Sequence, residues 1–243
     1  MYGRFAHIYD ELMDDVDYEA WFKYILEIYR REGLEPETVL EMAAGTGNLS
    51  SYLAGAGFDL TCFDLSSEML AVLDRKLAGQ KKVRILRQDM TDFSLGQKYD
   101  SVLCICDSLN YVTEDGAIEK VFKNVYNHLE EGGLFIFDIN SAYKLREVLG
   151  ENTFIEDRED IFYAWENFQL EDAIVELYIN FFVRSGETGF ERFTEQHYER
   201  IYELEEILAG LKAAGFSNIS YYKAFSFDPV DAGTERINFV IKK

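Results

Sequence analysis

Between residues 38 and 140, short apolar runs alternate with segments in which apolar residues recur every three or four positions. The runs predict strands, because they are too short for helices and end at polar or glycine residues. The segments between them predict helices that bury one face. This alternation is typical of a parallel sheet covered by helices. The predicted elements are strand 38–42, helix 48–56, strand 59–64, helix 67–77, strand 83–87, strand 99–106, helix 115–128 and strand 133–140.

The helix predicted over 115–128 has a continuous apolar face. The glycine pair at 132–133 is expected to end it, because glycine favours the left-handed conformation that follows a helix. The residues that form the face at helical spacing are Ile118, Val121, Phe122, Val125 and Leu129.

The pattern changes near Gly150. From 174 to 184 apolar and mixed positions alternate, which places one wholly apolar face on an extended strand. Such a strand is typical of an antiparallel sheet. Runs at 161–169 and 190–197 complete a predicted meander, and a helix ending at Gly215 and strands 218–227 and 236–242 follow. The pattern therefore predicts the α/β class, with a doubly wound, seven-stranded Rossmann-like sheet and an antiparallel β insertion.

Composition and charge narrow the function. A chain of 243 residues with 48% hydrophobic residues can bury a large core. Its formal net charge of −21 disfavours nucleic acid and anionic membrane surfaces as partners. The amino terminus lacks the pattern of a signal peptide, and no apolar run is long enough to span a membrane, so we expect a cytoplasmic protein.

The three cysteines lie in apolar runs. Cys62, Cys104 and Cys106 are therefore expected to be reduced thiols rather than disulfide partners. A metal shared by Cys104 and Cys106 is disfavoured, because the chain has three histidines and no second cysteine pair. We predict no metal site.

The segment VLEMAAGTGNLS, residues 39–50, places a glycine-rich turn between the first strand and a helix. A dinucleotide fingerprint has a third glycine or alanine where this chain has Ser50. The carboxylate of Glu41 would repel a pyrophosphate, and no lysine follows Gly47 as in a phosphate-binding loop. The turn is therefore better suited to a cationic ligand without phosphate.

Four features now occur in order at the ends of successive predicted strands. They are Glu41, the pair Gly45-x-Gly47, Asp64, and Gln88-Asp89-Met90. This constellation resembles the class I S-adenosyl-L-methionine (S-adenosylmethionine)-dependent methyltransferases over most of the chain. It is most similar to bacterial members that methylate small molecules such as amino sugars or glycine. The resemblance implies S-adenosylmethionine as the cofactor and methyl transfer by in-line displacement.

The resemblance implies a role for each residue of these features. Ala43, Gly45 and Gly47 would lie beside the methionine part of the cofactor, and Glu41 would meet its ammonium group. Asp64 would accept hydrogen bonds from the ribose hydroxyls. The adenine would be covered by Leu65 and Met69, with Asp89 accepting from its amino group and the Met90 amide facing a ring nitrogen.

Some of these roles have structural alternatives. Asp64 could belong to a turn in which Ser66 caps the next helix, and Asp89 could cap the turn at Thr91. Leu65 and Met69 could be ordinary core residues.

The amino-terminal segment is rich in aromatic residues. In the resembling enzymes it closes over the cofactor, so Tyr9 would face the methyl group and substrate, and Tyr18 the methionine carboxylate. Both could instead be half-buried helix residues. Cys106, Asp107 and Ser108 would form the floor of the methionine pocket, and Asp107 and Tyr9 are the candidate catalytic residues. The candidates for a general base are His7, Tyr9, Asp107 and His197.

The resemblance also divides the chain into parts. Residues 1–32 would form a helical lid, and residues 33–150 and 200–243 the cofactor-binding core. Residues 151–199 would form the insertion, which is either a substrate lid or a contact in a homodimer.

The acceptor is expected to be a small molecule. Methyltransferases that act on the amino groups of nucleic-acid bases carry Asn or Asp-Pro-Pro-aromatic after the fourth strand, whereas this chain has Cys106-Asp107-Ser108-Leu109-Asn110-Tyr111. The aromatic residues of the insertion that could line its pocket are Trp165, Tyr178 and Phe182.

Two other functions remain open from the residues alone. An NAD(P)-dependent Rossmann oxidoreductase would place nucleotide phosphates at residues 45–47. A noncatalytic S-adenosylmethionine-binding partner protein would bind the cofactor without transferring its methyl group.

Overall fold

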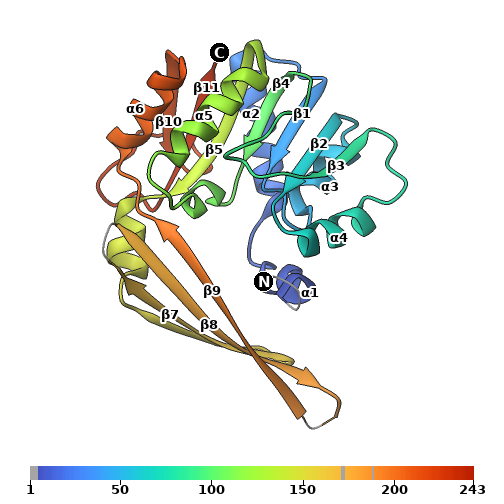
Figure 1. The fold of residues 1–243 in the computed structure, drawn as a ribbon, viewed down its shortest axis with the longest axis vertical. Coiled ribbons are helices and arrows are strands. Elements are labelled where there is room, and N and C mark those ends of the chain that lie inside the picture. The colour runs from blue at the N-terminus through green and yellow to red at the C-terminus, as the bar shows by residue number, and fades with distance from the viewer. Residues whose placement is uncertain (1–4, 171–172, 188) are drawn as a thin grey trace.

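A seven-stranded sheet forms the centre of the computed structural model, which describes residues 5–170, 173–187 and 189–243 (Figure 1). The strand order is β10-β11-β5-β4-β1-β2-β3. Strands β1 to β5 run parallel to their neighbours among themselves, and β11 runs antiparallel to both β5 and β10. The strands are β1 (Thr38–Met42), β2 (Asp59–Asp64), β3 (Val83–Arg87), β4 (Tyr99–Cys104), β5 (Leu129–Asn140), β10 (Asn218–Lys223) and β11 (Arg236–Lys242).

Helices cover both faces of this sheet, which confirms the predicted fold class. Helices α2 (Tyr18–Glu32), α3 (Asn48–Gly55) and α4 (Ser67–Lys76) contribute to one hydrophobic cluster, in which Ile25, Leu53 and Leu73 are buried. Helices α5 (Ala117–His128) and α6 (Leu204–Ala214) contribute to the other. Among the described residues, no helix combines the length and apolar character needed to cross a membrane.

A second, antiparallel sheet projects from the core as an arm (Figure 1). The arm consists of β6 (Thr153–Asp157), β7 (Ile161–Gln169), β8 (Ile174–Ser185) and β9 (Gly189–Arg200). The apolar face predicted from alternation is the better buried one, since Val175 and Phe181 are almost inaccessible to solvent. Strand β6 has no counterpart in the prediction, because its five residues, TFIED, show no clear alternation.

Several element bounds differ from the prediction. Helix α5 ends at His128, as in the predicted range 115–128, but the glycine pair 132–133 does not end it. Leu129 already pairs with Tyr99 and begins β5, whose predicted start was residue 133. Strand β10 ends at Lys223, whereas the run was expected to continue to 227. The chain turns there, and Phe227 packs back against Tyr24 with ring centroids 5.3 Å apart.

Two short helices follow strands at the edge of the sheet that carries the candidate residues. Helix η1 (Ser108–Tyr111) follows β4, and η2 (Lys144–Leu149) follows β5. Neither was predicted, because such short segments lack a repeating apolar pattern. Both contribute residues to the cavity described next.

Candidate active site

One cavity of about 730 Å³ lies where the carboxyl ends of the core strands meet the arm and helix α1 (Phe5–Leu12). Twelve of the thirteen predicted site residues line it. We call the part formed by residues 41–48, 64–69 and 88–91 the glycine-loop half. The arm half is lined by Asp107, Asn140, Lys144, Trp165, Glu199 and Arg236, among others.

Gly47 is the predicted residue that does not line the cavity. It adopts a φ of 82°, and a Cβ atom there would lie 2.8 Å from Cγ of Leu73. Its lack of a side chain therefore permits close packing of the turn against α4. Gly45 and Ala43 do line the cavity, and both have positive φ angles, of 55° and 50°. The alanine stores strain that the glycine does not.

Glu41 is buried in the glycine-loop half. Its Oε2 accepts hydrogen bonds from the Ser50 hydroxyl, at 2.5 Å, and from the Cys62 thiol, at 3.9 Å. Ser50, which fits a dinucleotide fingerprint poorly, thus positions this carboxyl group. Burial raises the pKa of Glu41 to about 8, and the nearby charge of Asp64 adds to the effect.

Asp64 lies at the end of β2 with its carboxylate directed at the glycine loop. It accepts from the Gly45 amide at 2.9 Å and from the Ser66 amide at 2.8 Å. Burial raises its pKa, and these amide hydrogen bonds oppose the rise. The Ser66 hydroxyl caps α4 by accepting from the Met69 amide at 3.2 Å. The turn geometry is thus present, and Asp64 lines the cavity as well.

The remaining wall of the glycine-loop half is apolar with one carboxylate. Leu65 is 61% exposed and Met69 only 5%, so Leu65 is not an ordinary core residue. Met90 lies beside Asp89 on the cavity wall. The Oδ1 of Asp89 accepts from the amide and hydroxyl of Thr91, at 2.8 and 2.7 Å, as in the predicted turn.

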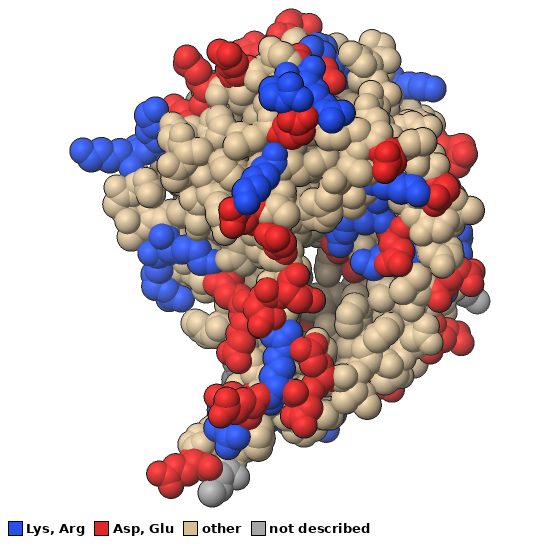
Figure 2. Space-filling model, turned by 180° about the vertical axis from the view of Figure 1, so that it is seen from behind, with Lys and Arg blue, Asp and Glu red and all other residues tan. Residues whose placement is uncertain are grey.

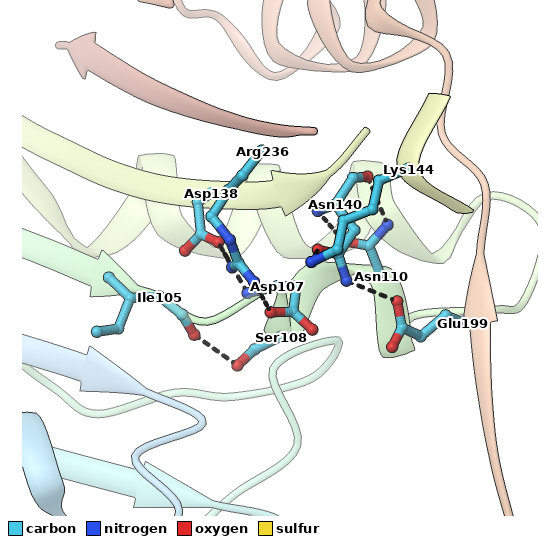
Figure 3. Close-up of polar contacts among 9 residues, drawn as sticks. All are labelled: Ile105, Asp107, Ser108, Asn110, Asp138, Asn140, Lys144, Glu199 and Arg236. Atoms are coloured by element: carbon cyan, nitrogen blue, oxygen red, sulfur yellow. Dashed lines mark hydrogen bonds and ion pairs between the residues drawn. The ribbon is translucent and has the colours of Figure 1, made fainter. Parts of the chain in front are cut away.

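The chain after β4 is held in an unusual backbone conformation. Cys106 and Asp107 have φ angles of 58° and 51°, which residues other than glycine seldom adopt. The Asp107 amide donates to Oδ2 of Asp138 at 2.9 Å, and the Asp107 carboxylate pairs with Arg236 at 2.7 Å. Arg236 also pairs with Asp138, which is fully buried (Figure 3). These charged contacts stabilise the strained turn.

Helix α1 connects the two halves of the cavity. The Asp10 carboxylate accepts from the Thr46 hydroxyl at 2.5 Å, from Asn48 at 3.0 Å and from Lys76 at 2.8 Å, all on the glycine-loop side. On the other side, the ring of Phe5 lies 5.6 Å from that of Phe181 in the arm. Helix α1 therefore contacts both the core and the arm over the cavity.

Tyr9 of α1 and Tyr18 of α2 both line the cavity. Burial raises the pKa of both phenols above the usual range, so they stay protonated at neutral pH and are unsuited as bases. His7 is exposed and does not line the cavity. His197 does line it, and burial lowers its pKa.

Of the three aromatic residues of the arm that were expected to line the cavity, only one does so. Trp165 lines the cavity, together with Leu177 and Ile179. Tyr178 and Phe182 do not, because side chains alternate along β8 and theirs lie on the opposite face. The prediction for these two residues was wrong.

Three charged residues of the arm half were missed in the sequence. Glu199 is 2% exposed, accepts from Nδ2 of Asn140 at 3.1 Å, and has its pKa raised by burial to about 8. Lys144 donates to Oδ1 of Asn140 at 2.9 Å (Figure 3). Lys144 comes from η2, Glu199 from β9 and Arg236 from β11, so no local sequence motif links these three residues.

Comparison with known proteins shows the family. Residues 39–133 match the model of a methyltransferase domain. The chain is 43% identical to an S-adenosylmethionine-dependent methyltransferase from Clostridium acetobutylicum ATCC 824, with a TM-score of 0.91 over 99% of this chain and 98% of that one. The chain belongs to the class I S-adenosylmethionine-dependent methyltransferases.

Two further relatives support this assignment over different lengths. The methyltransferase is 35% identical to YqeM of Bacillus subtilis (strain 168), provisionally named a methyltransferase, over 100% of this chain and 97% of that protein. It is 24% identical to a Streptomyces fradiae dTDP-3-amino-3,6-dideoxy-alpha-D-glucopyranose N,N-dimethyltransferase, over 56% of this chain and 53% of that protein. The predicted family is confirmed, and the oxidoreductase alternative is set aside.

The cofactor of this methyltransferase is S-adenosylmethionine, and the cavity fits it chemically. The glycine-loop half presents the carboxyl groups of Glu41, Asp64 and Asp89. Among the described lining residues, Lys144 and Arg236 alone carry a fixed positive charge, and both lie in the arm half. A cationic nucleoside thus meets favourable charge in the glycine-loop half, whereas a pyrophosphate would meet repulsion.

Proposed function

We propose that the methyltransferase transfers a methyl group to a small-molecule acceptor that binds in the arm half. The observation that carries this proposal is the enclosure of the cavity by α1 and the arm. Asp10 ties α1 to the glycine loop, and Arg158 of the arm pairs with Asp14 at 3.0 Å. A polymer chain would need these contacts to open, whereas a small molecule can be enclosed with water excluded.

In this proposal the glycine-loop half holds the cofactor. Glu41 would meet its ammonium group and Asp64 its ribose hydroxyls, while Leu65 and Met69 would cover the adenine. The hydroxyl of Tyr18 would donate a hydrogen bond to the methionine carboxylate. S-adenosylmethionine supplies, when bound, an electrophilic methyl group on a sulfonium sulfur.

The task of the remaining residues is alignment. The strained turn at Cys106 and Asp107 places the floor between the two halves, and the salt bridges of Arg236 fix it. Tyr9 would face the acceptor from the lid, as a hydrogen-bond donor. Of the predicted lid 1–32, helix α1 then acts as the lid, whereas α2 packs on the core sheet. Residues 151–199 act as a substrate lid, and the rest as the cofactor-binding core.

Distant relatives give the proposal further support. The Streptomyces fradiae relative is named for dimethylation of an amino sugar, and another, from Halorhodospira halochloris, is named a glycine/sarcosine N-methyltransferase. Both names describe small acceptors.

A labelled methyl group tests the proposal. The protein is incubated with S-adenosylmethionine carrying an isotopic methyl label and with an extract of Bacillus subtilis separated into small-molecule and macromolecular fractions. We expect label in the small-molecule fraction. Label confined to protein or nucleic acid would contradict the small-molecule acceptor, and no transfer to either fraction despite cofactor binding would favour a noncatalytic role.

A further inference from the structure

The arm half contains a buried carboxyl group that has no cationic partner of its own in the described part of the chain. Glu199 lies on β9 with its side chain on the cavity wall, where 2% of the residue is exposed. Its neighbour His197, two positions along the strand, lines the same half. A buried carboxylate is costly unless a cation or several hydrogen-bond donors compensate it.

The two cations near Glu199 form ion pairs or hydrogen bonds with other groups. Arg236 pairs with both Asp107 and Asp138. Lys144 donates to the amide oxygen of Asn140, and the amide nitrogen of Asn140 donates to Glu199. Asn140 thus stands between Lys144 and Glu199, as Figure 3 shows. Within residues 5–170, 173–187 and 189–243, Glu199 takes part in no ion pair.

The charge count of this cluster leaves one negative charge unbalanced when Glu199 is ionised. Three carboxyl groups, those of Asp107, Asp138 and Glu199, face two cations, Lys144 and Arg236. A ligand that brings one positive charge would balance the cluster when all three carboxyl groups are ionised.

We infer, building on the proposed function, that the acceptor carries a basic amine and that Glu199 binds it as an ammonium ion and removes its proton before methyl transfer. In this step an N–H bond of the ammonium breaks, its electron pair stays on nitrogen, and an O–H bond forms on the Glu199 carboxylate. The nitrogen then has the lone pair that methyl transfer requires.

The basicity of Glu199 suits an amine and not a hydroxyl group. Burial and the charge of Asp107 raise its pKa to about 8, with Asn140, Lys144 and Arg236 opposing the rise. An alkyl ammonium has a pKa of about 10 in water, close enough for proton transfer. A hydroxyl of pKa about 16 is far too weak an acid for this carboxylate.

The charge of the arm supports a cationic acceptor. Residues 151–199 include 13 acidic and three basic side chains. Figure 2 shows acidic side chains gathered along the arm, beside a hollow between the arm and the core. Such a field attracts cations toward the cavity. Trp165, whose indole N–H is buried on the cavity wall and has no partner among the described residues, offers a donor to an oxygen of the same ligand.

Glu195 provides a matched control. It lies on β9 four residues before Glu199, on the same side of the strand, and is 5% exposed. Burial raises its pKa as well, but it does not line the cavity. Glu195→Gln therefore reproduces the loss of a buried arm carboxylate without touching the acceptor.

The experiment begins with the compound labelled in the small-molecule extract. We expect mass spectrometry and NMR to place the methyl group on nitrogen. With that compound as substrate, Glu199→Gln should lower kcat/KM about 10²–10⁴-fold, whereas Glu195→Gln should stay within about threefold of the wild type. Binding of the same compound to the cofactor-free protein, measured by calorimetry, should weaken at least about tenfold in Glu199→Gln alone.

The pH profile separates proton removal from a structural role. For the wild type, kcat/KM should rise with pH as Glu199 ionises, with a pKa near 8. In Glu199→Gln this limb should shift to the pKa of the acceptor itself. A methyl group on oxygen, sulfur or carbon, or a Glu199→Gln variant within about threefold of the wild type, would overturn the inference and leave the proposed function standing. Label in macromolecules alone would instead refute the proposed function.

Discussion

The two halves of the cavity each hold one buried glutamate whose pKa is raised to about 8, and the halves differ in what surrounds it. Glu41 contacts neutral donors, the hydroxyl of Ser50 and the thiol of Cys62. Glu199 lies in a cluster of charges that includes Arg236. Burial is the largest cause of the raised pKa in both groups, so the pKa does not reveal the role of either one.

The surroundings do distinguish them. A carboxyl group among fixed neutral donors suits a ligand group that stays charged, such as the ammonium of the cofactor. A carboxyl group among cations and amides suits a ligand group that must give up a proton. We therefore assign Glu41 to the cofactor and Glu199 to the acceptor, and the following variants test this difference.

The largest expected effect is on the pH dependence of stability. Both glutamates are protonated in the folded protein and ionised in the unfolded chain between pH 4.5 and about 8, so the unfolded state binds fewer protons there. The stability they contribute is present below pH 4.5 and is lost as pH rises through 8. The loss is on the order of 4 kcal/mol for each group.

Glutamine variants isolate the contribution of each glutamate to the pH dependence of stability, because glutamine resembles a protonated glutamate in shape. In urea unfolding, Glu41→Gln and Glu199→Gln should each match the wild type near pH 4.5 and exceed its free energy of unfolding near pH 8. If the free energy of unfolding changes with pH in the same way for the wild type and both variants, the two carboxyl groups do not cause the pH dependence of stability.

The ion pairs of Arg236 should matter next, since they exist only in the arm half. Arg236→Met leaves Asp138 buried without a cation and should lower the free energy of unfolding by about 3–5 kcal/mol. Arg236→Lys keeps the charge and should lose less. The measurement is chemical denaturation at neutral pH, and a loss below about 1 kcal/mol for Arg236→Met would refute this role.

The smallest effect concerns the attachments of the lid. Asp10 contacts the glycine loop, so Asp10→Asn should speed release of S-adenosylhomocysteine about fivefold in stopped-flow fluorescence, the equivalent of about 1 kcal/mol. Asp14 pairs with Arg158 of the arm, and Asp14→Asn should leave that rate unchanged. Equal rates in the two variants would mean that Asp10 does not hold the lid over the cofactor.

The sequence predicts the two halves unequally well. The glycine-loop half comes from consecutive strand ends, so Glu41, Asp64 and Asp89 could be located from short motifs. The arm half joins residues more than 90 positions apart, such as Asp138 and Arg236, through antiparallel pairing that no local pattern encodes. Because side chains alternate along a strand, Tyr178 and Phe182 could have been excluded from the cavity wall once Leu177 was known to face the cavity.

The core fold was predictable for a related reason. Strands and helices of the core have strong periodicity, whereas β6, η1 and η2 are too short to show one. The start of β5 depended on pairing between Leu129 and Tyr99, which is a tertiary contact.

The most direct test of the assignment is the affinity for S-adenosylhomocysteine, measured by calorimetry at neutral pH on three proteins. We predict that Glu41→Gln weakens binding at least about tenfold and that Glu199→Gln stays within about twofold of the wild type. Equal weakening in both variants, or weakening in Glu199→Gln alone, would contradict the division of the cavity into a cofactor half and an acceptor half.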